Sequence, residues 1–352
     1  MRLAVDLMGG DHGPEELLQG VKMGLEADPS IEHVFVVGPE AELCPIIARI
    51  GLEDRRLEVR TASEVLTMQD DPAIAIRRKK DSSLLRAIEL VREGKAHAVI
   101  SSGNTGALVA GSTVRLGRLE GVKRPTLACI MPSRNGAWIL VDGGANPECT
   151  PEILLQFAVM GSVYAQSMLS IKRPRVGILS NGTEESKGTE LTRQALALVQ
   201  RSDLNCIGFC EGHSLFADGV DVVVCDGFVG NIVLKTCESL GKAVGSMLRH
   251  EMTATPFRKL GAVLARNGLE SLKHRMNPDV YGGAPFLGLH GNVVKIHGSA
   301  RRLALKYAML QSSRAVGQQL NDLLEREIAK IRPLTTHLHS QIPPAAGVAE
   351  AN

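Results

Sequence analysis

The sequence predicts an α/β fold in which a mostly parallel sheet is flanked by helices. Short apolar runs alternate with amphipathic, helix-period segments along most of the 352 residues, and this alternation is typical of repeated strand–helix units. Hydrophobic residues make up 44% of the chain, which is ample for a sizeable core. Several apolar runs end abruptly in glycine and small polar residues, as in "AVISSGNTGA" and "DVVVCDGFVGN". Together these observations predict a Rossmann-like sheet with a site at its strand ends.

The first part of the chain consists of such units. We expect its apolar runs to be strands and the amphipathic segments between them to be helices. The strands are expected at Leu3–Asp6, Val34–Val37, Leu57–Thr61 and Ala98–Ile100, and the helices at Pro14–Glu26, Ala41–Ile50 and Ser82–Glu93. The runs Thr126–Met131 and Trp138–Asp142 flank Asn135-Gly136. Because that pair suits a tight turn, we expect an antiparallel hairpin there.

The second part continues the pattern and then becomes mainly helical. Its elements are expected as a helix at Pro151–Leu169, a strand at Val176–Leu179, a helix at Glu190–Arg201, strands at Cys206–Phe209 and Val222–Cys225, a helical stretch from Asn231 to about His250 with breaks at Thr253–Pro256 and Asn267-Gly268, short strands near Phe286–Leu289 and Val293–Ile296, and a final helix at Arg301–Ile331. We expect one α/β domain over residues 1–332, with a helical excursion at about 238–276. Residues 333–352 are rich in Pro and Ala and are expected to be a disordered tail.

Composition excludes several classes of protein. The formal net charge is only +2 and aromatic residues make up 3% of the chain, so there is no basic, aromatic-interleaved surface for nucleic acid. The seven cysteines show no CxxC spacing and are expected to be reduced thiols of a cytoplasmic protein. We expect no signal peptide and no membrane-spanning helix, because no apolar run is long enough for either.

The loop "SSGNTGA" is the first candidate site. Gly103 and Gly106 flank Asn104 and Thr105 at the start of a predicted helix. Backbone N–H groups and the helix dipole at such a position favour a bound anion, so we expect these four residues to bind phosphate. The alternative is an ordinary Asn or Thr helix cap after a strand.

Two further strand-end loops carry candidate residues. In "SNGTEESKG", Asn181 and Thr183 can donate hydrogen bonds and Lys187 can supply a positive charge, although "TEES" also resembles a helix-capping sequence. In "CDGFVGN", Asp226 is a candidate general base or orienting group, or simply a helix cap, and Asn231 lies at a helix start. The neighbouring Cys225 is expected to be a buried thiol rather than a nucleophile.

Two histidines lie in glycine-rich loops. His12 follows the paired glycines of "DLMGGDHGP", and His297 belongs to "VKIHGSA". Both are candidates for a phosphate contact, although a lone histidine is more often structural. The glycines of the first loop do not form GxGxxG, and the second strand ends without an acid for a ribose, so a dinucleotide site is not favoured.

The segment Thr255–Met276 combines an apolar face with basic residues. The apolar face consists of Phe257, Leu260, Val263 and Leu264, and the adjacent cations include Arg258 and Lys259. Such a face predicts contact with an anionic membrane or an acidic partner. The alternative is a helix whose apolar face packs on the core.

The motifs together resemble a known family. In order they are "DLMGGDHGP", "SSGNTGAL", "RPTLACIMP", "DGGAN", "SNGTEESKG", "CDGFVGNIVLK", "GGAPFLGLHG" and "IHGSA". This ordered set, spanning residues 1 to about 330, resembles the bacterial phosphate acyltransferases. The resemblance implies a fold similar to phosphotransacetylases and isopropylmalate-type dehydrogenases. It also implies a cytoplasmic homodimer that associates loosely with the membrane and needs neither cofactor nor metal.

The resemblance further implies a reaction and its partners. Acyl–acyl carrier protein, an acidic protein, would donate an acyl group to inorganic phosphate, and the acyl phosphate would be consumed by a membrane glycerol-3-phosphate acyltransferase in phospholipid synthesis. Lys187 would balance negative charge, Asp226 would orient or deprotonate the phosphate, and Asn231 would donate a hydrogen bond. The alternatives are a phosphotransacetylase that uses acyl-coenzyme A, a dehydrogenase that requires NAD and magnesium, and a non-catalytic phospho-ligand sensor or membrane scaffold.

Overall fold

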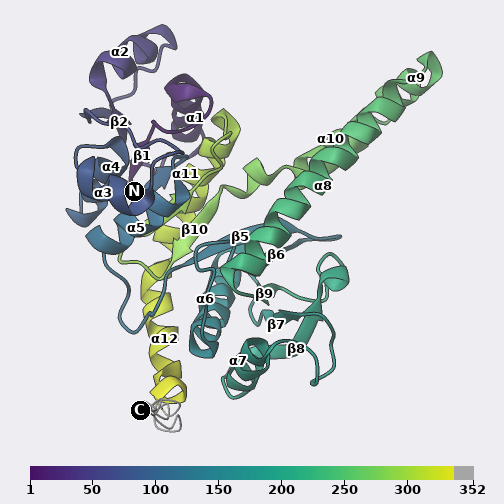
Figure 1. The fold of residues 1–352 in the computed structure, drawn as a ribbon. Helices are drawn as coiled ribbons and strands as arrows, with labels where there is room; N and C mark the ends of the chain where they lie inside the picture. Colours follow the sequence, from purple (N-terminus) through teal and green to yellow (C-terminus); the bar gives the residue numbers. More distant parts are fainter. Residues whose placement is uncertain (337–352) are drawn as a thin grey trace, which may run out of the picture.

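The computed structural model describes residues 1–336, and eleven strands of this part of the chain join in one sheet (Figure 1). The strands are β1 (Arg2–Asp6), β2 (His33–Gly38), β3 (Leu57–Thr61), β4 (Ala98–Ser101), β5 (Thr126–Pro132), β6 (Ala137–Val141), β7 (Arg175–Ser180), β8 (Asn205–Glu211), β9 (Val222–Val224), β10 (Ala284–Leu287) and β11 (Asn292–Lys295). The helices are α1 (Gly13–Ala27), α2 (Glu40–Arg49), α3 (Pro72–Arg78), α4 (Ser83–Arg92), α5 (Thr105–Arg115), α6 (Pro151–Leu169), α7 (Glu190–Gln200), α8 (Gly227–Thr253), α9 (Pro256–Leu264), α10 (Arg266–Met276), α11 (Arg302–Gly317) and α12 (Leu320–Thr336).

The sheet has two parallel halves that run in opposite directions. Its strand order is β3-β2-β1-β4-β11-β10-β5-β6-β9-β7-β8. Strands β3, β2, β1, β4 and β11 are mutually parallel and form the N-terminal half. Strands β6, β9, β7 and β8 are likewise parallel and form the C-terminal half. The pairs β11–β10, β10–β5 and β5–β6 between them are antiparallel, so three reversals of direction separate the halves.

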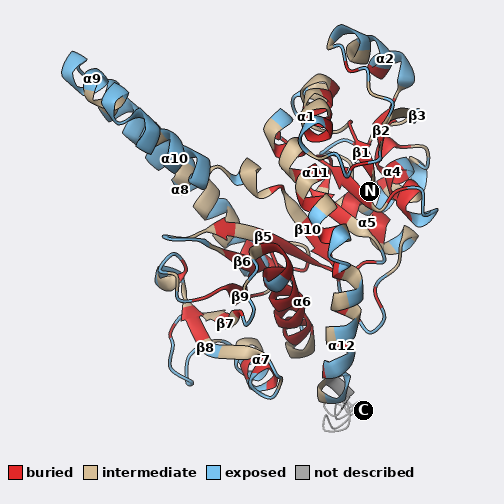
Figure 2. Ribbon diagram, turned by 180° about the vertical axis from the view of Figure 1, so that it is seen from behind, coloured by how far each residue is buried: buried red, intermediate tan, exposed pale blue. Residues whose placement is uncertain are grey.

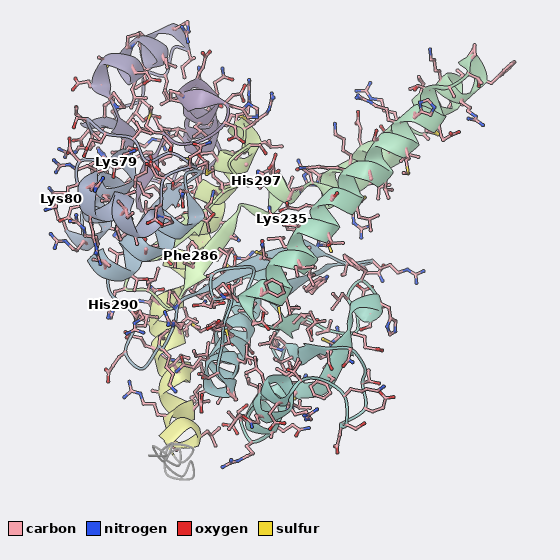
Figure 3. The ribbon with its side chains drawn as sticks, viewed as in Figure 1. Lys79, Lys80, Lys235, Phe286, His290 and His297 are labelled. Carbon is pink, nitrogen blue, oxygen red and sulfur yellow. The ribbon has the colours of Figure 1, made fainter. Side chains whose placement is uncertain are left out.

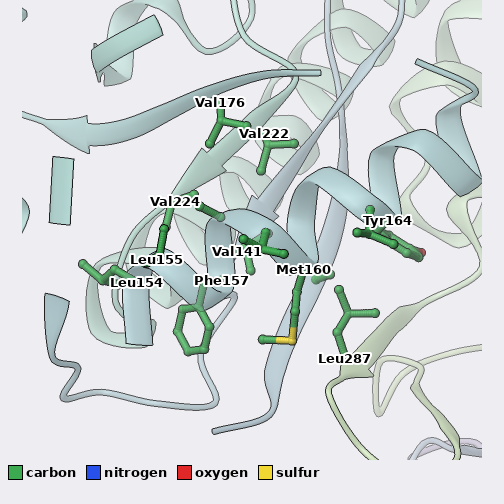
Figure 4. Packing of buried hydrophobic residues seen from close by; sticks show 14 of the residues in the cluster. Val141, Leu154, Leu155, Phe157, Met160, Tyr164, Val176, Val222, Val224 and Leu287 are labelled. Carbon is green, nitrogen blue, oxygen red and sulfur yellow. The ribbon is translucent and has the colours of Figure 1, made fainter. Parts of the chain in front are cut away.

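Helix α6 is the centre of the core in the C-terminal half. Figure 4 shows its side chains packed among residues of β6, β9 and β10. Phe157 and Leu154 are fully buried, as are Val141 and Val224 on the adjoining strands. Helix α6 is buried along nearly its whole length, because the sheet covers one side and α7 and α12 pack on others. A helix that is apolar all round is typical of such a position.

Helices α8, α9 and α10 form an arm that projects from the body of the molecule (Figure 1). Helix α8 has 27 residues, which corresponds to about 40 Å at 1.5 Å per residue. Only Gly227 and Gly230 in its first turn are buried, and neither α9 nor α10 has a buried residue. Figure 2 shows this exposure along the arm. Val233, Leu234 and Cys237 near the start of α8 pack on the core, whereas α9 and α10 have no buried residue to anchor them to it.

The structure confirms the predicted α/β class and the hairpin formed by β5 and β6. The expected single final helix is wrong: α11 ends at Gly317 and α12 starts at Leu320, with Gln319 at a φ of 52°. The reason is tertiary, because the buried residues of α11 and α12 pack into different parts of the core. The expected break at Asn267-Gly268 is also wrong, since α9 ends at Leu264 and Gly268 lies inside α10. One glycine costs a helix only about 1 kcal/mol, which tertiary context readily overrides.

The predicted tail has only its first four residues in the described part of the chain. Residues 333–336 continue α12 to Thr336, so the expectation of disorder is wrong for them. The rest of the predicted tail, residues 337–352, lies outside the described residues. The short helix α3 was not expected; Asp71 caps it by accepting the Ile74 N–H at 2.9 Å.

The junction between α8 and the sheet tolerates no side chain at Gly230. A Cβ there would lie 1.8 Å from the Asp142 carbonyl oxygen, so we expect Gly230→Ala to shift the start of α8, lower the melting temperature and reduce activity. Gly245, also in α8, has no atom within 4 Å of the corresponding position. Gly245→Ala is the matched control and should stabilise the helix by up to about 1 kcal/mol. Equal melting temperatures for the two variants by circular dichroism would contradict this prediction.

Candidate active site

The carboxyl ends of β1, β4 and β11 form a buried polar cluster in the N-terminal half. The Ser101 hydroxyl donates a hydrogen bond to Asp6 Oδ2 at 2.7 Å. The Lys295 ammonium donates to the Ser102 carbonyl at 2.9 Å and to the Ile296 carbonyl. Burial raises the pKa of Asp6 and lowers the pKa of Lys295 to about 8, because loss of water disfavours either charge. These contacts hold the three strand ends together.

The loops that follow these strands also approach one another closely. The Asp11 N–H donates to the Gly298 carbonyl at 2.9 Å, which joins the loop after β1 to the loop after β11. A Cβ at Gly10 would lie 2.7 Å from Ser102 Oγ. Glycine therefore allows the loop after β4 to pack on the loop after β1. The result is one surface made from three strand ends.

Asn104 caps α5, as one of the two interpretations predicted. Its Oδ1 accepts the Ala107 N–H at 3.0 Å. Its Nδ2 donates to backbone carbonyls of the loop before α3, those of Thr67, Met68 and Asp70. Because the Asn104 side chain is used inside the protein, the loop offers an anion mainly backbone N–H groups. Those of Thr105 and Gly106, in the first turn of α5, have no partner within the helix.

Both candidate histidines border the same loops. His12 precedes α1, is exposed and makes no capping hydrogen bond with its side chain. His297 is exposed, and its Nδ1 accepts the Ser299 N–H at 3.1 Å. This bond leaves the proton of the neutral ring on Nε2, which can donate to a ligand. The structure thus brings His12 and His297 together with the loop of Gly103 and Asn104.

A second group of candidates lies at the strand ends of the C-terminal half. Asp226 follows β9 and caps α8 by accepting the Val229 N–H at 2.9 Å, so the capping interpretation is confirmed. Asn231 is exposed on the second turn of α8. A Cβ at Gly144 would lie 3.2 Å from Asn231 Cβ, which places this asparagine against the loop after β6.

The loop after β7 is the third part of this group. Asn181 Oδ1 accepts the Gly188 N–H at 2.9 Å and so closes the loop on itself. Thr183 and Lys187 are exposed. A Cβ at Gly182 would lie 2.5 Å from Lys187 Cγ, so the stem of this lysine lies across the loop while its ammonium remains in solvent.

The predicted residues therefore fall into two groups, one on each half of the sheet. Four strands lie between β4 and β9 in the sheet order. The two are therefore five strand spacings apart, which is about 24 Å at 4.8 Å per spacing. The three antiparallel pairings between the halves also turn their strand ends in different directions. Asn104 and Asp226 accordingly do not share one set of loops.

One face of α8 spans the interval between the two groups. It carries Asn231, Lys235, Glu238 and Lys242 at helical spacing. The His297 pKa is lowered by partial burial and by the positive charges of Lys235 and Lys242, and Lys235 also lowers the pKa of Lys295. Figure 3 shows Lys235 on the part of α8 that lies toward His297. The helix thus leads from the loops of the C-terminal half to those of the N-terminal half.

The Cys225 thiol, next to Asp226, is not suited to nucleophilic attack. Burial raises the pKa of Cys225 well above its ordinary value, which disfavours the nucleophilic thiolate and agrees with the predicted buried thiol. Among the described residues, no group of three or more His, Cys, Asp or Glu side chains is placed to hold a metal ion.

Comparison with known proteins identifies the family. The model of the FA_synthesis family, described as fatty acid synthesis protein, matches residues 1–323. A phosphate acyltransferase of Desulfitobacterium hafniense strain Y51 is 43% identical over 333 residues, which cover 94% of this chain and 98% of that protein. One of Clostridium acetobutylicum is 39% identical over 331 residues, covering 94% of this chain and 100% of that protein. The chain belongs to this phosphate acyltransferase family.

The solved structures show the same fold as the one predicted. A phosphotransacetylase from Streptococcus pyogenes has a TM-score of 0.61 at 16% identity and covers 90% of this chain and 94% of its own. EutD phosphotransacetylase from Staphylococcus aureus has a TM-score of 0.59 at 16% identity, covering 89% and 93%. Because the chain belongs to the phosphate acyltransferase family, it is an acyltransferase that uses phosphate as acceptor.

Sequence reasoning missed three charged residues of this acyltransferase. Lys235 was missed because it lies in a segment with helical periodicity, where a lysine is normally solvated. Asp6 and Lys295 are the last residues of β1 and β11, and the sequence assigned a role to neither. The available signal was that each of these residues directly follows buried apolar residues of its strand, 3–5 in β1 and 293–294 in β11, so it is buried with them.

Lys235 lies on the face of α8 toward His297, where its ammonium also donates to Glu238 at 2.8 Å, and we predict that it helps to hold phosphate. We expect Lys235→Ala to raise the KM for phosphate about tenfold, because a hydrogen bond to a charged group contributes roughly 1.5–3 kcal/mol. Arg249→Ala, which removes an exposed positive charge farther along α8, is the matched control. Steady-state kinetics with phosphate as the varied substrate test this. An unchanged KM in Lys235→Ala would remove this residue from the site.

Proposed function

We propose that this enzyme transfers a fatty acyl group from acyl–acyl carrier protein to inorganic phosphate, giving acyl phosphate for phospholipid synthesis. The observation that carries the proposal is the 43% identity to a phosphate acyltransferase over 94% of the chain. The site supports it, because each set of strand-end loops, with Lys235 on α8, offers N–H donors or positive charge that suit a phosphate dianion.

In the proposed reaction a phosphate oxygen attacks the thioester carbonyl carbon. The C–O bond forms, the C–S bond breaks, and the carrier thiolate leaves and takes up a proton. Because a thiol has a pKa of about 8.5, its thiolate is a good leaving group and needs no strong acid. Fixed N–H donors and cations stabilise the oxyanion of the tetrahedral intermediate.

The proposed roles follow the two groups of residues. The phosphate-binding residues are Gly103, Asn104, Thr105, Gly106, His12 and His297 in the N-terminal half, with Asn181 and Thr183 in the C-terminal half. Asn104, Thr105 and Gly106 act through backbone N–H groups, whereas the Gly103 N–H already donates to Ser101 Oγ at 3.0 Å. A single phosphate contacts only one of the two groups, because β4 and β9 lie about 24 Å apart in the sheet. Lys187 balances the charge of phosphate or of the oxyanion. Asp226 orients the nucleophile while it caps α8, and Asn231 donates a hydrogen bond to phosphate or to the carbonyl.

Product analysis tests the proposed reaction directly. We expect labelled inorganic phosphate and acyl–acyl carrier protein to give labelled acyl phosphate and free carrier, and Lys187→Ala to reduce its rate. Acyl-coenzyme A is the control donor. Labelled product from acyl-coenzyme A but not from the acylated carrier would favour a phosphotransacetylase instead, and binding of phosphate without turnover would favour a sensor.

The arm supports two further parts of the proposal, a homodimer and a contact with the membrane surface. An exposed apolar stripe runs along α8 through Phe228, Ile232, Leu240, Val244 and Met247, and a second copy of the chain is its proposed partner. A monomeric mass by sedimentation equilibrium would contradict the homodimer. None of the described helices combines the length and apolar character that a membrane crossing requires.

The tip of the arm is the proposed membrane contact of this cytoplasmic enzyme. Phe257 is 88% exposed and Leu264 81%, and Leu260 and Val263 are also exposed. These residues do not pack on the core of their own chain, so the core-facing interpretation of this segment is wrong. The neighbouring Arg258 and Lys259 suit an anionic surface, beside the downstream membrane acyltransferase that would consume the product.

Substitution at the tip tests the membrane contact. We expect Leu260→Glu to reduce co-sedimentation with vesicles of anionic phospholipid at least several-fold, because it places a charge in the apolar face. Val114 is exposed on α5, away from the arm, so Val114→Glu is the matched control. Unchanged sedimentation of a folded Leu260→Glu protein would argue against the membrane contact.

A further inference from the structure

Four cations lie at the end of α3 and just after it, and three of them have no acidic partner among the described residues. The sequence "RRKK" occupies residues 77–80. Lys79 is neutralised, because its ammonium donates to Asp70 at 2.6 Å and to the Val65 carbonyl. Arg77, Arg78 and Lys80 are exposed, and within the described residues none of them has an ion pair. We refer to these three residues as the α3 basic segment.

The acids around this segment are already engaged. Asp70 pairs with Lys79 and Asp71 caps α3. Asp81 pairs with Arg86, and Ser63 lowers its pKa to about 2 by hydrogen bonding. The positive charge of the α3 basic segment is therefore not cancelled by its own neighbourhood.

Apolar side chains are exposed beside the cations. Ile74 on α3 is 53% exposed, and Met68 in the preceding loop is 40% exposed. A mixture of unpaired cations and isolated apolar side chains is typical of the rim and centre of a protein–protein contact. A simple phosphate subsite would need no apolar groups.

The segment is attached directly to the candidate site. Asn104 donates to three carbonyls of the 67–70 loop. A Cβ at Gly106 would lie 2.7 Å from Pro72 Cγ, and one at Gly298 would lie 2.7 Å from Met68 Cε. The loop and the start of α3 thus lie against the strand-end loops of β4 and β11. A partner on the α3 basic segment would be held beside the entrance to these loops.

We propose that the α3 basic segment is the docking surface for the acidic carrier protein that presents the acyl thioester. This inference rests on the proposed function and names the surface that its protein substrate uses. A carrier delivers its acyl group on a flexible arm, so its folded body binds next to the reacting atoms rather than over them. Charge complementarity then speeds association and orients the carrier.

The arm tip is a less suitable place for the carrier. Its apolar residues are more exposed and more numerous, and Arg258 is paired with Glu251. The tip also lies at the far end of α8, away from the strand-end loops (Figure 1). Figure 3 shows Lys79 and Lys80 on the N-terminal half, on the side away from the arm. The two surfaces can therefore serve different partners.

Charge reversal tests the docking surface. We expect Arg78→Glu with Lys80→Glu to raise the KM for acyl–acyl carrier protein about tenfold at low salt, because complementary charges act mainly on association. Added salt should raise the wild-type KM more steeply than that of the variant. Direct binding of the unacylated carrier, measured by fluorescence anisotropy, should weaken in parallel. Arg78→Ala with Lys80→Ala should show a smaller effect in the same direction.

A matched control and the rival arm surface decide whether the α3 basic segment binds the carrier. Lys172→Glu with Arg173→Glu, a pair of exposed cations in the α6–β7 turn that form no ion pair with any residue up to 336, should leave carrier binding unchanged. Equal loss in this pair, or loss in Arg258→Glu with Lys259→Glu and none in the α3 variants, would overturn the proposal. Because the anisotropy measurement needs no turnover, carrier binding at α3 without acyl phosphate formation would reject the proposed reaction while retaining the docking surface.

Discussion

The arrangement of the molecule depends on the buried carboxylate of Asp142. It accepts the Leu127 N–H of β5 at 2.8 Å, and N–H groups of the following loop, those of Gly144, Ala145 and Asn146. Burying a carboxylate costs several kcal/mol unless such donors replace its water; here burial still raises its pKa. The donors fix the loop after β6 against β5. Because Gly230 packs directly on the Asp142 carbonyl, the same loop fixes where α8 begins.

This constraint places several surfaces on one helix. The two parallel halves of the sheet run in opposite directions, so their strand ends alone do not form a single site. Helix α8 starts at the C-terminal half and carries Lys235 to the neighbourhood of His297. A straight helix has fixed angular relations between its faces. The polar face toward the loops, the apolar stripe and the position of the tip are therefore set together by the Asp142 loop.

Much of the fold was predictable because its determinants are local. Apolar runs ending in glycine located the strands, and the helix at Pro151–Leu169 was predicted with the bounds observed for α6. The break between α11 and α12 was not, because it depends on which part of the core each helix contacts. Lys295 was missed for a similar reason: its partners are the carbonyls of Ser102 and its neighbour Ile296. The capping role of Asn104 was only the alternative to the expected anion site, and its amide contacts with residues 67–70 were not predicted at all.

The separation of the proposed surfaces has a consequence for catalysis at a membrane. If the arm tip rests on lipid, the about 40 Å length of α8 keeps the body of the enzyme in water. The α3 basic segment lies on the side of the N-terminal half away from the arm (Figure 3), so a soluble carrier can approach without crossing the lipid surface. An anionic membrane would repel an acidic carrier over about 10 Å at 0.1 M salt. A docking surface displaced from the tip would avoid that repulsion, so the distance between the cations of α3 and those of α9 suits the two proposed partners.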